Sequence, residues 1–138
     1  MMNNIREDKA RLQGIVQSIG NTIVNVLPDS WSKVVLGYFV VGDNQVSHFQ
    51  FHTITATSDD YIDLMEESWD SDELDDTIIE VQRLCKEMRS ICIACKDCWT
   101  AMTFMMQADG SFDIEYGYDE IADYDAQYIL KWQSQYLN

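Results

Sequence analysis

A run of carboxylates stands out among the side chains that could do chemistry in this chain. Residues 59–76, DDYIDLMEESWDSDELDD, contain ten Asp and Glu side chains and no Lys or Arg. A calcium-binding loop of the EF-hand type needs a glycine at its sixth position, and this segment has no glycine. Three interpretations remain: a looser cation site, a solvated and self-repelling loop that leads into a helix, or a surface for a strongly basic partner.

A second acidic cluster lies between residues 109 and 125 and also lacks Lys and Arg. Tyrosines are interleaved with its carboxylates, and tyrosine supplies large, rigid contact area at protein interfaces. Carboxylates spaced along a surface can imitate a phosphate backbone, so a basic protein that handles nucleic acid would be a natural partner. The alternative is again a solvated face. The cluster comprises Asp109, Asp113, Glu115, Asp119, Glu120, Asp123 and Asp125.

The four cysteines are the other candidates for chemistry. Cys92, Cys95 and Cys98 form the sequence CIACKDC, and Cys85 stands seven residues earlier. Thiolates can hold zinc or an iron–sulfur cluster. However, Cys85, Cys92 and Cys95 fall on the apolar stripe of an expected helix, where free cysteine behaves as a small hydrophobe. We expect no metal and no cofactor, and we keep a metal- or redox-responsive protein as an alternative function.

Signatures of catalysis are scarce. The sequence has no G-x-S-x-G and no G-x4-G-K-[ST] motif, which mark serine hydrolases and P-loop proteins. His48 and His52 lie four residues apart on an expected strand and should share one face, where packing is the expected role and a weak metal pair the alternative. We predict that the protein is not an enzyme.

Net charge limits the classes of partner. The formal charge of −15 disfavours direct binding to nucleic acid and to anionic membranes, whose phosphates would repel it. The N-terminal segment MMNNIREDKARLQG lacks the apolar core of a signal peptide, and no run of about 18 apolar residues follows. We expect a cytoplasmic protein with reduced cysteines.

Hydrophobic periodicity predicts three helices. Apolar residues at spacings of three and four predict a helix over residues 5–27, stopped by Pro28, which has no N–H to donate. A second helix should run from Glu73 to Cys95, and a third over residues 119–137. The apolar stripe of the third comprises Ile121, Tyr124, Tyr128, Trp132 and Tyr136.

Two hairpins are expected between these helices. Strand-forming residues flank the turn Gly42-Asp43-Asn44, and alternating residues flank Ala108-Asp109-Gly110-Ser111. The expected fold is a single α+β domain over residues 1–138 in the order α-β-β-α-β-β-α. Its antiparallel sheet of about four strands should be packed with helices.

Five segments in this order resemble the YezG-like family of immunity proteins: NVLPDSWSKVVLGYFV, LCKEMRS, CWTAMTF, DGSFDIEYGYDE and ILKWQSQYL. The resemblance covers residues 12–137 approximately. It implies a small α+β antitoxin that protects the toxin-producing cell by binding the C-terminal domain of a secreted toxin, in known cases a nuclease. The acidic segment 59–76 and the cysteine-rich end of the long helix depart from the family pattern, and no toxin-contacting position is carried over.

The residues and the resemblance lead to one hypothesis: stoichiometric inhibition of a basic toxin domain through an acidic surface. That surface would block either the substrate groove of the toxin or an exosite. Trp69 and Tyr61 would anchor the middle of that surface. An adaptor or chaperone for a basic client is an alternative. The expected partner-binding residues are Asp59, Asp60, Tyr61, Asp63, Glu66, Glu67, Trp69, Asp70, Asp72, Glu73, Asp75, Asp76, Asp113, Glu115 and Asp119.

Overall fold

The computed structural model describes residues 5–43, 45–123 and 125–137, and the side chains from residue 8 onward within these ranges. Asn44 of the expected turn and Tyr124 of the expected third helix therefore lie outside the described residues. The elements are α1 (Ile5–Val24), β1 (Trp31–Val41), β2 (Val46–Thr55), β3 (Ile62–Asp63), α2 (Leu64–Glu67), the 3-10 helix η1 (Ser68–Asp70), α3 (Asp72–Ala94), β4 (Ala101–Gln107), β5 (Phe112–Gly117) and α4 (Ala126–Tyr136).

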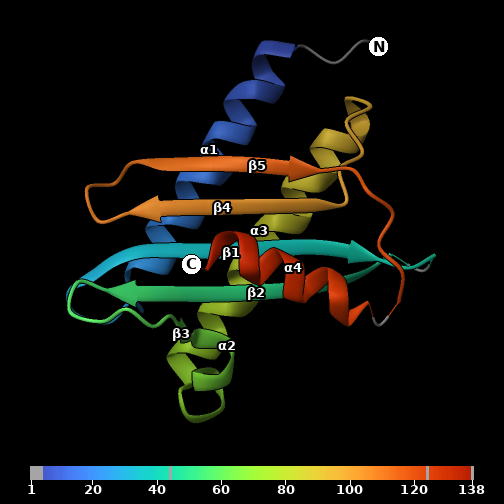
Figure 1. The fold of residues 1–138 in the computed structure, drawn as a ribbon. Helices are drawn as coiled ribbons and strands as arrows, with labels where there is room; N and C mark the ends of the chain where they lie inside the picture. Colours follow the sequence, from blue (N-terminus) through green and yellow to red (C-terminus); the bar gives the residue numbers. More distant parts are fainter. Residues whose placement is uncertain (1–4, 44, 124, 138) are drawn as a thin grey trace.

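All the strands pair antiparallel in one five-stranded sheet, in the order β3-β2-β1-β4-β5. β1 is central, and its residues 34–40 are all buried. A continuous apolar run is what a strand covered on both faces requires, whereas a strand with one wet face alternates. The two expected hairpins are therefore joined edge to edge through β1 and β4, which leaves β5 at one end of the sheet (Figure 1).

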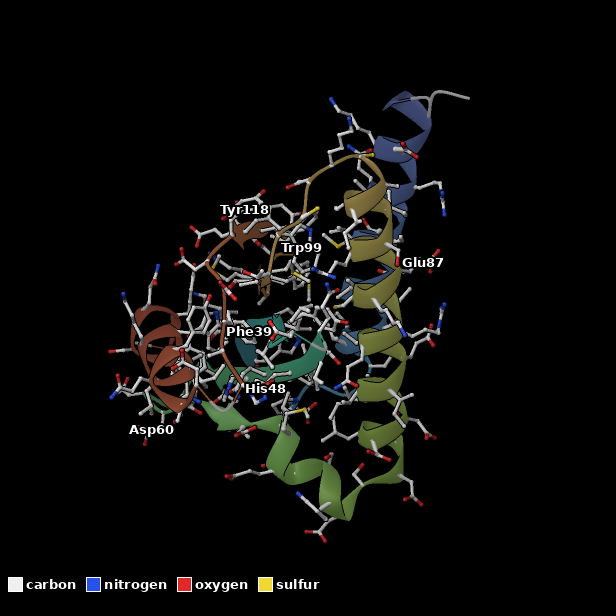
Figure 2. The ribbon with its side chains drawn as sticks, turned by 90° about the vertical axis from the view of Figure 1, so that its right-hand side faces the viewer. Phe39, His48, Asp60, Glu87, Trp99 and Tyr118 are labelled. Atoms are coloured by element: carbon white, nitrogen blue, oxygen red, sulfur yellow. The ribbon has the colours of Figure 1, made fainter. Side chains whose placement is uncertain are left out.

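Helices cover both faces of this sheet (Figures 1 and 2). α1 and α3 lie antiparallel on one face, over the larger core cluster that contains Leu36 and Tyr38 of β1. α4 lies on the other face, over a smaller cluster that contains Val35, Phe39 and Trp132. Among the described residues, no helix is long and apolar enough to cross a membrane.

The expected fold class is confirmed, with corrections at element ends. α1 ends at Val24 rather than Leu27, because Pro28 disfavours the helical conformation in the residue before it. α3 matches the expected range to within one residue, but Cys95 lies beyond its last turn and is exposed rather than on the apolar stripe.

The third helix is shorter than expected and begins at Ala126 rather than at residue 119. Ile121 is buried, but it lies in the connection that precedes the helix. The amide of Gly42 donates to the carbonyl of Ile121 at 2.7 Å, which ties this connection to the β1–β2 hairpin. The Asp125 side chain then caps the helix by accepting from the Tyr128 amide at 3.0 Å.

The acidic run contains more structure than the expected loop and helix start. β3, α2 and η1 all fall within it. β3 pairs with β2 through His52 and Asp63, and the Asp63 side chain caps α2 by accepting from the Met65 amide at 3.0 Å. Leu64 anchors this segment in the larger core cluster, where it is 2% exposed.

Gly42 is expected to tolerate a side chain poorly. Its φ is +71°, and an added Cβ would collide with the Asp123 carboxylate. Gly110 has a φ of +89° but no atom within 4 Å of an added Cβ. Gly110→Ala should lower the free energy of unfolding by about 1–2 kcal/mol for conformation alone, and Gly42→Ala by more. Urea unfolding measures both losses, and equal losses would show that the Asp123 side chain moves aside without cost.

Candidate functional site

The acidic surface, defined as the ten carboxylates of residues 59–76, lies at the β3 edge of the sheet. In Figure 2 Asp60 lies on the α4 side, and the run continues through α2 and η1 to the start of α3 on the other side. The Ser71 hydroxyl caps α3 by accepting from the Leu74 amide at 3.2 Å. The backbone that carries these charges is therefore folded and capped.

These carboxylates are exposed and electrically uncompensated. Nine of the ten residues are exposed, and Asp63, which caps α2, is partly buried. Within the described part of the chain, ion pairs involve only Arg83, with Glu80 and Glu87. The sequence has no Lys or Arg between Lys33 and Arg83. The surface therefore carries a concentrated negative field with no internal counter-charge.

Trp69 projects from η1 in the middle of the acidic surface, where it is 89% exposed. A large indole in water is a candidate anchor, because tryptophan is enriched among the residues that dominate binding energy. The second expected anchor, Tyr61, is less exposed than Trp69. Its ring is partly buried against the smaller core cluster, and this burial raises the pKa of its hydroxyl.

The second acidic cluster lies at the opposite edge of the sheet. Asp113 and Glu115 belong to β5, and Asp119 follows it. Four inter-strand spacings, about 19 Å, separate the two edges. Glu115 accepts a hydrogen bond from the Tyr136 hydroxyl of α4. The structure therefore does not bring Asp113, Glu115 and Asp119 to the segment 59–76.

The sequence reading missed a separation of charge along the α1–α3 layer. Lys9 and Arg11 lie in the first half of α1, and Lys86 and Arg89 in the second half of α3. The two helices are antiparallel, and the Cys95 thiol at the end of α3 donates to Asp8 at 3.4 Å. These cations therefore lie at the end of the layer opposite the acidic surface. The stretch between Lys33 and Arg83, which contains no Lys or Arg, was the feature of the sequence that could have predicted this separation of charge.

Three of the four thiols, those of Cys85, Cys92 and Cys95, are poorly placed for metal binding or redox chemistry. Cys85 and Cys92 are buried in the core, and burial raises the pKa of Cys85 to about 12. The Asp8 carboxylate raises the pKa of exposed Cys95. Raised values disfavour the thiolate, which is the metal-binding and nucleophilic form. Across the described residues, no group of three or more His, Cys, Asp or Glu side chains could hold a metal ion.

The two histidines share the sheet face under α4, as expected from their spacing. The Gln50 amide links them, with its oxygen 2.7 Å from His52 Nε2 and its nitrogen 2.9 Å from His48 Nε2. Gln133 of α4 donates to the same oxygen at 3.2 Å. His52 also packs its ring against Trp132. Together these contacts attach α4 to the sheet.

We expect salt to stabilise the protein by screening the acidic surface. Raising NaCl from 20 to 200 mM shortens the Debye length to below about 10 Å. Relief of roughly 1 kcal/mol of repulsion should raise the thermal midpoint by about 3–6 °C. The quadruple variant Asp59→Asn, Asp60→Asn, Glu66→Gln, Glu67→Gln should respond less. An equal response of both proteins, measured by calorimetry, would place the repulsion elsewhere.

Comparison with known proteins identifies the class of this molecule. Residues 12–138 match the family model described as Immunity protein YezG-like. The chain therefore belongs to the YezG-like immunity protein family. It is similar to Immunity protein YezG of Bacillus subtilis (strain 168), with 26% identity over 113 residues that cover 80% of this chain and 75% of that protein.

Proposed function

We propose that this protein is a cytoplasmic, non-enzymatic immunity protein that neutralises a cognate secreted toxin domain by stoichiometric binding through the acidic surface. Residues 1–138 act as one domain without a cofactor. The observation that carries this proposal is the set of nine exposed carboxylate residues, free of ion pairs in the described structure, around a Trp69 that is 89% exposed.

The toxin domain that best matches this surface is basic, and a nuclease is the best candidate. A nuclease binds polyphosphate through Lys and Arg side chains. A dense array of carboxylates can occupy the same groove. Electrostatic steering raises association rates by about 10- to 1000-fold, which favours capture of the toxin before it cuts.

The two acidic clusters have different expected roles. The carboxylates of residues 59–76 form the centre of the interface, with Trp69 inserted into the toxin. Tyr61 joins the contact through its exposed edge. Asp113, Glu115 and Asp119 lie about 19 Å away across the sheet, so they contact only a toxin that spans the α4 face.

The test is retrieval of the partner from the native cell. Tagged protein is captured, washed at low and high salt, and its bound proteins are identified by mass spectrometry. We expect one dominant basic partner, released by high salt, whose nuclease activity stops at a one-to-one ratio. A partner that binds but keeps its activity would instead indicate an adaptor or chaperone.

A matched pair of variants locates the surface. Asp70→Lys lies in the acidic surface, and Asp43→Lys lies in the hairpin turn between β1 and β2; both residues are exposed. Asp70→Lys should slow association at least tenfold at low salt, and Asp43→Lys less than twofold. Equal effects of the two changes would contradict the proposed location.

A further inference from the structure

β5 presents an open strand edge of the sheet. Among the described residues, β4 is the only strand that pairs with β5, and at the other edge of the sheet β3 pairs only with His52 and Thr53 of β2. β5 has six residues, most of them exposed, and it forms the outer edge in Figure 1. An edge of this length is a template for pairing with another strand.

The register shows which backbone groups face outward. The Gln107 amide donates to the Ser111 carbonyl at 2.9 Å, and Met105 is opposite Asp113. In an antiparallel ladder, alternate residues direct their N–H and C=O groups to the same side. The groups of Asp113 and Glu115 therefore point to β4, and those of Phe112, Ile114 and Tyr116 point away from the sheet.

The side chains beside this edge differ between the two faces. Asp113 and Glu115 lie on the α4 face, opposite Met105 and Thr103. Phe112 and Tyr116 lie on the other face, where they are 47% and 39% exposed. An incoming strand would therefore meet carboxylates on one face and aromatic rings on the other.

A second copy of this chain is a poor occupant. If two β5 strands paired antiparallel with their faces aligned, Asp113 and Glu115 of both copies would lie opposite one another. Like charges directly opposite are destabilising. A strand with Lys or Arg at alternate positions and apolar residues between them has the complementary pattern.

We propose that the open edge of β5 accepts an extended, alternately basic segment of a partner protein as a sixth strand. The outward amides of Phe112, Ile114 and Tyr116 supply the hydrogen bonds, and Asp113 and Glu115 select the basic residues. This site lies at the edge of the sheet opposite the acidic surface. It shares only Asp113 and Glu115 with the outer contacts proposed for a toxin that spans the α4 face.

The test uses the isotope-labelled full chain and the peptide acetyl-TKVKVKT-amide. We expect binding to slow hydrogen exchange at the amides of Phe112, Ile114 and Tyr116 at least tenfold. A peptide of the same composition in blocks, acetyl-TVVKKKT-amide, should bind at least fivefold more weakly. Versions N-methylated on alternate residues, made in both registers, separate strand pairing from charge attraction, and at least one of them should lose binding.

Variants of the protein complete the test. Asp113→Lys should weaken binding of the alternating peptide about tenfold, and the matched reversals Asp70→Lys and Asp43→Lys less than twofold. Unchanged exchange at the three amides, or equal binding of the alternating and block peptides, would overturn the proposal. The carboxylates would then serve only to protect the edge from self-pairing. Either outcome leaves toxin capture by the acidic surface unaffected.

Discussion

The Trp69→Ala variant is expected to bind the toxin domain roughly 30- to 700-fold more weakly than the native protein, a loss of about 2–4 kcal/mol. The side chain is 89% exposed, so it contributes little to the stability of the free protein. We therefore expect the free energy of unfolding to change by less than about 0.5 kcal/mol. Binding calorimetry and urea unfolding measure the two quantities.

Leu130→Ala is the matched control for Trp69→Ala. Leu130 is also a large, exposed hydrophobic residue, 62% exposed on α4, but it lies outside the acidic surface. Its truncation should leave toxin binding within twofold. Native affinity in Trp69→Ala, or a large loss in Leu130→Ala, would move the interface from η1 to α4.

Trp132→Ala should have the largest effect on stability, about 3–5 kcal/mol. Trp132 is 5% exposed, its ring packs edge-on against Phe39 at 5.4 Å, and its Nε1 donates to the Thr103 hydroxyl at 2.9 Å. α4 has 11 residues, too few for stability without tertiary packing. Removal of the indole should therefore detach α4 from the sheet.

Trp132→Phe separates the contribution of ring packing from that of the hydrogen bond to Thr103. It keeps an aromatic ring against Phe39 but leaves the buried Thr103 hydroxyl without its donor, so it should lose about 1–3 kcal/mol. Urea unfolding gives both values. A loss below 1 kcal/mol in Trp132→Ala would show that α4 is held by other contacts.

Local patterns predicted the elements that are long and periodic. The stripe from Leu74 to Cys92 predicted α3, because every turn contributes a buried residue. The alternation in β2 and the Asp-Gly turn before β5 predicted the hairpins. β3 and α2 were missed because they have two and four residues, too few for a period to be visible. Ile121 misled the prediction of α4, because a loop residue tied to the hairpin can be as buried as a helical one.

The sequence predicted which types of residue form the site, but it did not predict how they are arranged in space. The density of Asp and Glu in residues 59–76 follows directly from the sequence. The exposure of Trp69 and the partial burial of Tyr61 depend on how η1 and β3 pack, which the sequence does not show. The placement of Asp113 and Glu115 at the far edge depends on pairing between β1 and β4, a contact between distant segments that hairpin signals cannot predict.

The central claim is that the acidic surface is where the toxin is held. Hydrogen–deuterium exchange of the one-to-one complex, compared with that of the free protein, tests it most directly. We predict slower exchange across residues 62–76, with the amides around Trp69 most affected. Unchanged exchange in this segment, with protection confined to α4 or to α1, would contradict the account.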